Sequence, residues 1–160
     1  MRCNLRNKYL LAACVLVLVA LCFLSIYSPM EFRTEQTRRE EAVKRRLVMI
    51  RGAEEKYMAS RGTYTHCMDS LVKARLLPDS ARYIPFSDNK EFTLTTSVVI
   101  GKSGKNIPLM ECSAGYEEYL YGLDTNAIAE LIEKANSSGQ FPGLKIGDIA
   151  EPNSNAGNWE

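Results

Sequence analysis

The stretch AEEKYMASRGTYTHCMDSL, residues 53–71, decides how the chain folds. A run of good helix formers meets Gly62, with Tyr57 before the glycine and Tyr64 after it. Glycine adopts positive φ without steric cost, so Gly62 is well placed to end a helix. We therefore expect a helix-end junction at Tyr57, Gly62 and Tyr64.

The residues before this junction predict a long amphipathic helix. Apolar side chains recur at the three-to-four-residue spacing of one helical face, while Arg, Lys and Glu fill the other faces. The pattern predicts a helical stem over residues 29–60. Its apolar face would pack on the protein's own sheet or on neighbouring molecules, and it consists of Val43, Leu47, Ile50 and Tyr57.

A hydrophobic segment precedes the stem. Residues 9–27 carry no charge, and a helix of that length spans the ~30 Å core of a bilayer. Signal-peptidase and lipoprotein sites are poorly formed, so we expect an uncleaved anchor at residues 9–28 after a short tail at residues 1–8. The basic residues nearest the anchor precede it. They indicate a cytoplasmic N-terminus and a periplasmic C-terminal domain of a single-pass inner-membrane protein.

Residues 61–160 predict a small extracytoplasmic α+β domain. The fold class expected is a transmembrane helix continued by a long amphipathic helix that packs on a small antiparallel sheet. Turn formers dominate the end of the chain, which should be ordered only where its apolar residues dock on the core. The expected elements are a short helix at residues 69–77, strands at 91–100 and 106–112, and a helix that begins at Asp124 or Thr125.

Composition and motifs argue against several classes of function. A net charge of +1 over 160 residues gives no field that would attract nucleic acid. The turn GKSGK lacks two residues of a phosphate loop, because Val99 and Asn106 occupy the positions of its first glycine and its hydroxyl residue. The only histidine, His66, is expected on a surface loop. We expect neither an enzyme nor a small-molecule substrate.

Two further groups of residues need a decision. Cys67 and Cys112 are the cysteines of the expected domain, and they are candidates for a disulfide in an oxidising compartment, although nothing in the sequence brings them together. Oxygen-bearing side chains in the C-terminal loop are weak candidates for calcium, with a solvated loop as the alternative. They are Asp148, Glu151, Asn153 and Asn155. No other cofactor is expected.

The layout resembles type IV pilins and the pseudopilins of type II secretion. In that family a membrane helix continues into a stem that ends in an aromatic-glycine-aromatic run, here Tyr57, Gly62 and Tyr64 followed by Leu71. The chain's ending, GNWE at residues 157–160, is similar to the tail of major pseudopilins. The resemblance implies a structural protein that assembles, or scaffolds, in an envelope secretion or pilus-type system, with the bilayer, its own copies or other secretion proteins as partners.

Two features of the family are missing from this sequence. The first glycine is Gly52, so no glycine precedes the apolar segment, and that segment contains no glutamate. These departures favour a second hypothesis. In it the protein is a single-pass membrane adaptor or accessory subunit that does not polymerise and whose extracytoplasmic domain binds a protein partner.

Overall fold

The computed structural model describes residues 5–101 and 104–160, without the side chains of residues 5–7 and 23–29. The chain divides into two compact units, Met1–Thr37 and Arg38–Glu160. Helix α1 (Leu5–Arg61) contributes to both units. The sequence predicts a stem at residues 29–60 and a separate domain at residues 61–160. In the structure, residues 38–61 belong to the same compact unit as the domain.

In the first unit, every side chain described between residues 8 and 22 is exposed. No helix in the described part of the chain has an apolar stretch long enough to cross a membrane. Residues 23–28 of the expected anchor at 9–28 lie outside the described side chains.

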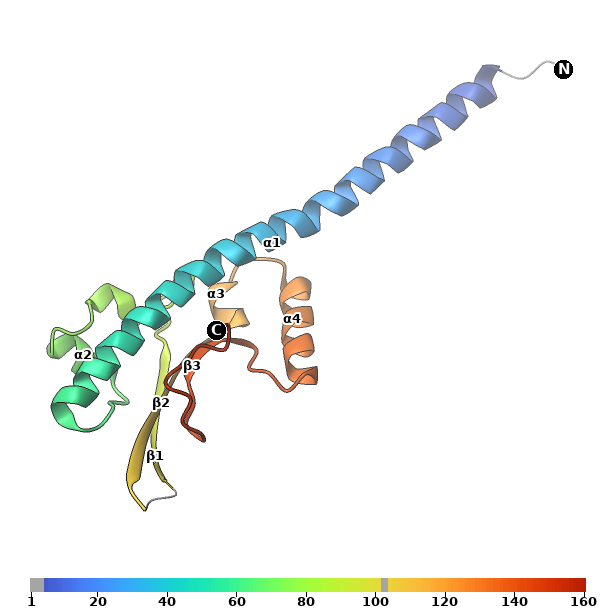
Figure 1. Ribbon diagram of the computed structural model, residues 1–160. Helices are drawn as coiled ribbons and strands as arrows, with labels where there is room; N and C mark the ends of the chain where they lie inside the picture. Colours follow the sequence, from blue (N-terminus) through green and yellow to red (C-terminus); the bar gives the residue numbers. More distant parts are fainter. Residues whose placement is uncertain (1–4, 102–103) are drawn as a thin grey trace. The chain divides into compact units, whose positions relative to one another are not determined.

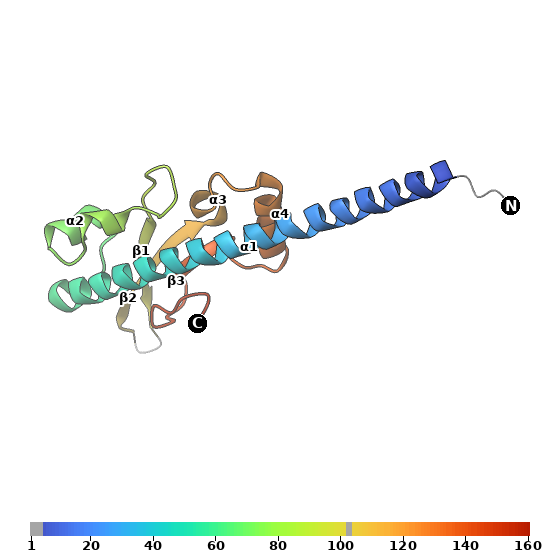
Figure 2. The ribbon, with the colours of Figure 1, turned by 90° about the horizontal axis from the view of Figure 1, so that it is seen from above.

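The second unit combines the end of α1 with short helices and one small sheet (Figures 1 and 2). Its class is α+β, as the sequence predicts. Its remaining elements are α2 (Met68–Lys73), a 3-10 helix η1 (Asp79–Arg82), β1 (Thr93–Ile100), β2 (Asn106–Gly115), α3 (Tyr116–Tyr119), α4 (Thr125–Ser137) and β3 (Gly143–Gly147).

The sheet has three antiparallel strands in the order β1-β2-β3. The hairpin of β1 and β2 runs in unbroken register from Thr93 opposite Ser113 to Ile100 opposite Asn106. The short strand β3 pairs with the end of β2, from Glu111 opposite Gly147 to Gly115 opposite Gly143. β2 is therefore the central strand, and it has paired neighbours on both sides.

The core of the second unit forms where α1 packs on this sheet. Val43, Leu47 and Ile50 are each 0% exposed, which fits the rule that residues at this spacing share one helical face. The sheet has a buried face toward the helix and a more open face, as is common for antiparallel sheets. Core residues from the strands are Leu109, Met110, Cys112, Ala114, Leu144 and Ile146.

The predicted helix end is confirmed. α1 ends at Arg61, and Gly62 follows with φ +76 and donates its N–H to the carbonyl of Met58 at 2.8 Å. A residue with left-handed φ just beyond the last turn is a common helix C-terminus, since its N–H satisfies a free helical carbonyl.

Most of the other predicted elements are confirmed with shifted ends. The two predicted strands are β1 and β2, and Asp124 caps α4 by accepting the N–H of Asn126 at 2.9 Å. The strand β3 is not predicted from the sequence, because glycines flank its few side chains and leave no recognisable alternation. α3 and η1, which are single turns, are not predicted either.

Replacing Gly62 with alanine should lower the free energy of unfolding by about 1 kcal/mol, because alanine disfavours left-handed φ. No atom lies within 4 Å of an added Cβ there, so the cost is conformational. Gly52→Ala is the matched control: it also has free space, but it lies inside α1 and should stabilise by about 0.5–1 kcal/mol. Urea unfolding of the full chain in detergent measures both, and shifts of the same sign would contradict this account.

Candidate functional site

The apolar face of α1 lies inside the second unit. Val43, Leu47 and Ile50, three of the residues predicted to divide between the sheet and neighbouring molecules, are all fully buried by their own unit. Tyr57 is half-buried. The large apolar side chains that this part of α1 leaves exposed are Val48 and Met49, at 43% and 46%. These two residues are therefore the large apolar side chains that the stem beyond residue 37 offers to a partner.

One helical turn beyond Ile50, the buried stripe ends in a carboxylate. Glu54 is 0% exposed, and its Oε2 accepts the backbone N–H of Thr65 at 3.1 Å. The other oxygen, Oε1, has no hydrogen-bond partner in the described part of the chain. Desolvation raises the pKa of Glu54 to about 7, and the Thr65 hydrogen bond opposes this in part.

This contact ties the two sides of the Gly62 turn together. Glu54 on α1 holds the backbone of Thr65, and the Thr65 hydroxyl in turn accepts the N–H of Cys67 at 3.2 Å, directly before α2. Glu54 is not among the site residues predicted from the sequence. The signal was present, because position 54 continues the spacing of residues 43, 47 and 50 around the helix.

The candidate disulfide is not formed in the structure. Cys67 and Cys112 are both free thiols. Cys112 is fully buried in the middle of β2, whereas Cys67 lies partly exposed just before α2. Burial raises the pKa of the Cys112 thiol, and the nearby charge of Glu54 raises it further. Cys112 therefore acts as a small apolar core residue rather than as a reactive thiol.

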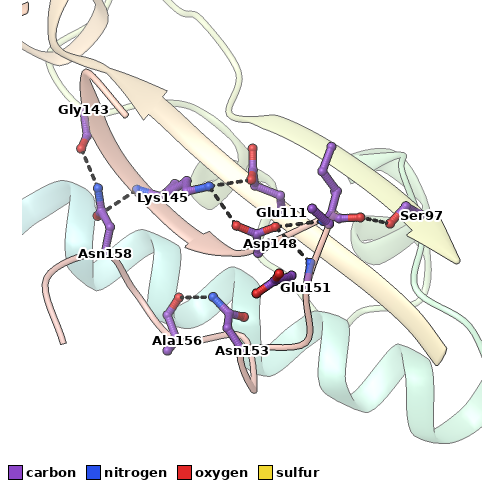
Figure 3. A network of polar contacts seen from close by, with 11 residues as sticks. Ser97, Glu111, Gly143, Lys145, Asp148, Glu151, Asn153, Ala156 and Asn158 are labelled. Atoms are coloured by element: carbon purple, nitrogen blue, oxygen red, sulfur yellow. Dashed lines mark hydrogen bonds and ion pairs between the residues drawn. The ribbon is translucent and has the colours of Figure 1, made fainter. Parts of the chain in front are cut away.

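The C-terminal tail is pinned along β3 (Figure 3). Asn158 makes two hydrogen bonds with the backbone of Lys145. Its N–H donates to the Lys145 carbonyl at 3.0 Å, and its side-chain oxygen accepts the Lys145 N–H at 3.2 Å. The Asn158 amide also donates to the carbonyl of Gly143 at 3.0 Å. Gly157 forms a bridge with Ile146. The tail thus covers the outer edge of β3.

The same tail reaches the helix-end junction. Asn155 donates its side-chain amide to the hydroxyl of Tyr64 at 3.0 Å. Arg51 on α1 donates to the carboxylate of Glu160 at 2.9 Å and to the Asn155 carbonyl at 3.2 Å. The Trp159 ring packs where a Cβ on Gly157 would meet it at 2.7 Å, which is why glycine stands there. The junction and the tail are one connected site.

The candidate calcium residues do not converge. Asp148 uses one carboxylate oxygen to accept the N–H groups of Ala150 and Glu151 and the other to bind the Lys145 ammonium at 3.3 Å. Lys145 also binds Glu111 at 2.8 Å, so an ammonium already supplies the positive charge (Figure 3). Asn155 faces Tyr64 instead. No cluster of metal-ligating side chains occurs among the described residues.

Comparison of the chain with known protein families, with characterised proteins and with solved structures finds no match.

Stability should fall as the pH rises from about 4.5 to about 7, because the folded state keeps a proton on Glu54 that the unfolded state has released. Glu54→Gln removes this titration and keeps an acceptor for Thr65, so its stability should vary less over that range. The neighbouring exposed Glu55→Gln is the charge-matched control. Urea unfolding at several pH values measures the effect, and equal slopes for all three proteins would disprove it.

Asn158→Ala should free the tail, because it removes the side-chain hydrogen bonds to Lys145 and Gly143. We expect a loss of about 1–2 kcal/mol in the free energy of unfolding. The amide of Gly147, which binds the Ala156 carbonyl, should exchange faster with deuterium. Glu151→Ala should change neither quantity, because Glu151 is an exposed residue of the same loop and its hydrogen bond to Asp148 is made by its backbone N–H. Unchanged exchange in Asn158→Ala would contradict the pinned tail.

Proposed function

We propose that the protein is a membrane-anchored, pilin-like or pseudopilin-like structural protein. Its α1 would assemble with neighbouring membrane proteins in an envelope secretion or pilus-type system. In this proposal the N-terminus is cytoplasmic and the α+β unit lies in the periplasm. The observation that carries the proposal is the set of uncovered apolar side chains on the N-terminal part of α1.

These side chains point in every direction around the helix. The consecutive residues Leu16, Val17, Leu18 and Val19 are 70%, 58%, 60% and 46% exposed. Successive residues of a helix are about 100° apart, so four in a row surround most of its axis. A helix that is apolar all round needs lipid or other helices as its surroundings. A bilayer with packed neighbouring helices supplies both.

The second unit supports a structural role as well. The buried face of α1 packs on the sheet of its own unit. Among the described residues, the C-terminal tail and the helix-end junction stabilise each other through hydrogen bonds. Val48 and Met49 remain for contacts with a neighbouring stem. The proposal therefore places assembly contacts on the exposed side of α1 and not on Val43, Leu47 or Ile50.

The adaptor hypothesis shares the anchor but not the assembly. The sequence favours it in one respect, since the glycine and the glutamate that pilin-like proteins carry around the apolar segment are missing. The two proposals differ in one measurable property. A pilin-like protein contacts its own copies along α1, and a non-polymerising adaptor does not.

Crosslinking along α1 in native membranes separates them. Single cysteines at Val15, Leu18, Val48 and Met49, in a chain without the five native cysteines, should form ladders of dimers and larger species after oxidation. Leu47→Cys is the matched control, because position 47 is buried within its own unit and should stay uncrosslinked.

Two results would overturn the proposal. If no exposed position forms crosslinks at normal expression and membrane insertion, the adaptor becomes the working account. If alkaline carbonate releases the chain from membranes, the anchor itself is disproved. Circular dichroism of each variant confirms that removal of Cys112, which is part of the core, leaves the fold intact.

A further inference from the structure

The outer edge of β1 is an uncovered hydrogen-bonding surface. β1 is an edge strand, and its only strand partner in the described part of the chain is β2. The hairpin of β1 and β2 projects beyond the helices of its unit (Figure 1). The backbone groups on the far side of β1 therefore face away from the rest of the unit.

The hairpin turn shows which residues present these groups. Gly101 donates its N–H to Lys105, the residue opposite it, so this pair is hydrogen-bonded. In an antiparallel ladder such pairs alternate along the strand, and residues 99, 97, 95 and 93 therefore turn their N–H and C=O groups toward β2. The outward groups belong to Leu94, Thr96, Val98 and Ile100.

The neighbouring chain covers only the start of this edge. The N–H of Phe92, which also points outward, binds the carbonyl of Arg82 at 3.1 Å, and Tyr83 forms a bridge with Glu91. Among the described residues, no other segment forms backbone hydrogen bonds or bridges with the outer side of β1 from Leu94 to Ile100. The open part of the edge is therefore one uninterrupted row of donors and acceptors.

This row lacks the features that keep edge strands from pairing. The sequence of β1, TLTTSVVI, has no proline, no lysine and no other charge, and its register with β2 has no bulge. Val98 and Ile100 are 59% and 77% exposed. Proteins usually protect long, flat, apolar edges with such features, so an unprotected edge points to a strand that binds it.

We propose that β1 binds β1 of a second copy of this chain, antiparallel and centred on Ser97. In this register Leu94 of one copy lies opposite Ile100 of the other, and Thr96 lies opposite Val98. Each copy then satisfies all of the outward N–H and C=O groups of its partner. The two three-stranded sheets become one continuous sheet across a two-fold axis.

Side chains and charges favour this occupant. Leu94, Thr96, Val98 and Ile100 share one face of the strand. The exposed Val98 and Ile100 would thus gain Thr96 and Leu94 of the second copy as cross-strand neighbours. The strand itself is neutral, so two copies do not repel each other.

The inference does not depend on the proposed function. It uses only the second unit, whereas assembly along α1 would use the exposed side of the helix. A protein that never polymerises through α1 can still pair through β1.

A single cysteine at the centre of the register tests the pairing. In the full chain without its native cysteines, purified in detergent, Ser97→Cys should form a disulfide-linked dimer under mild oxidation. The substitution removes only the hydrogen bond that the Ser97 hydroxyl donates to the Ile149 carbonyl. The two Cα atoms at the axis form a non-hydrogen-bonded pair about 4.5 Å apart, which a disulfide can bridge.

Thr95→Cys and Val99→Cys are the matched controls, since both residues share the face of Ser97. Each would lie about 13 Å or more from its own equivalent in the second copy, too far for a disulfide. Adding Val98→Lys to Ser97→Cys should reduce the dimer at least about fivefold by placing a charge on the edge. The far-ultraviolet spectrum should not change, because Val98 is exposed.

The unaltered chain provides a second measurement. Deuterium exchange at the amides of Thr96, Val98 and Ile100 should slow as the protein concentration rises. The proposal is overturned if Ser97→Cys crosslinks no better than the two controls, if Val98→Lys leaves the dimer unchanged, or if exchange at these amides is independent of concentration.

Discussion

The packing of residues 38–61 of α1 on one face of the sheet is the constraint on which the second unit depends. The central strand β2 carries the core residues Met110 and Cys112, which are both fully buried. Val43, Leu47 and Ile50 are fully buried as well and supply the helical part of the core. α1 ends at Arg61, and Gly62 with its left-handed φ provides that end.

The buried carboxylate of Glu54 couples this packing to the turn. A carboxyl group in the core is costly unless it is protonated or hydrogen-bonded, and Glu54 is hydrogen-bonded through one oxygen only. Its raised pKa of about 7 is the consequence. The segment after Gly62 is held by a group whose charge changes near neutral pH, and the tail reinforces that segment through Asn155 and Tyr64.

The two proposals rest on two exposed surfaces of the described molecule, and these surfaces differ in chemistry. The first unit exposes apolar side chains around α1, which call for lipid or apolar helices. The edge of β1 exposes backbone donors and acceptors, which call for another strand. In the two proposals made above, these surfaces would serve two independent contacts. The buried face of α1 is not among these surfaces, although its sequence pattern alone is equally compatible with assembly.

Local patterns in the sequence were sufficient for the α+β class with a long helix and a small antiparallel sheet, the helix end at Gly62, the hairpin of β1 and β2, and the cap of α4 at Asp124. Each of these follows from side-chain periodicity or from a residue with a special backbone preference, and both act over a few residues. Only the tertiary structure decided that β3 is a strand, that Glu54 is buried, that Cys67 and Cys112 stay unpaired, and that the tail meets Tyr64. Those outcomes depend on which segments far apart in the chain come into contact, and no local preference encodes such contacts.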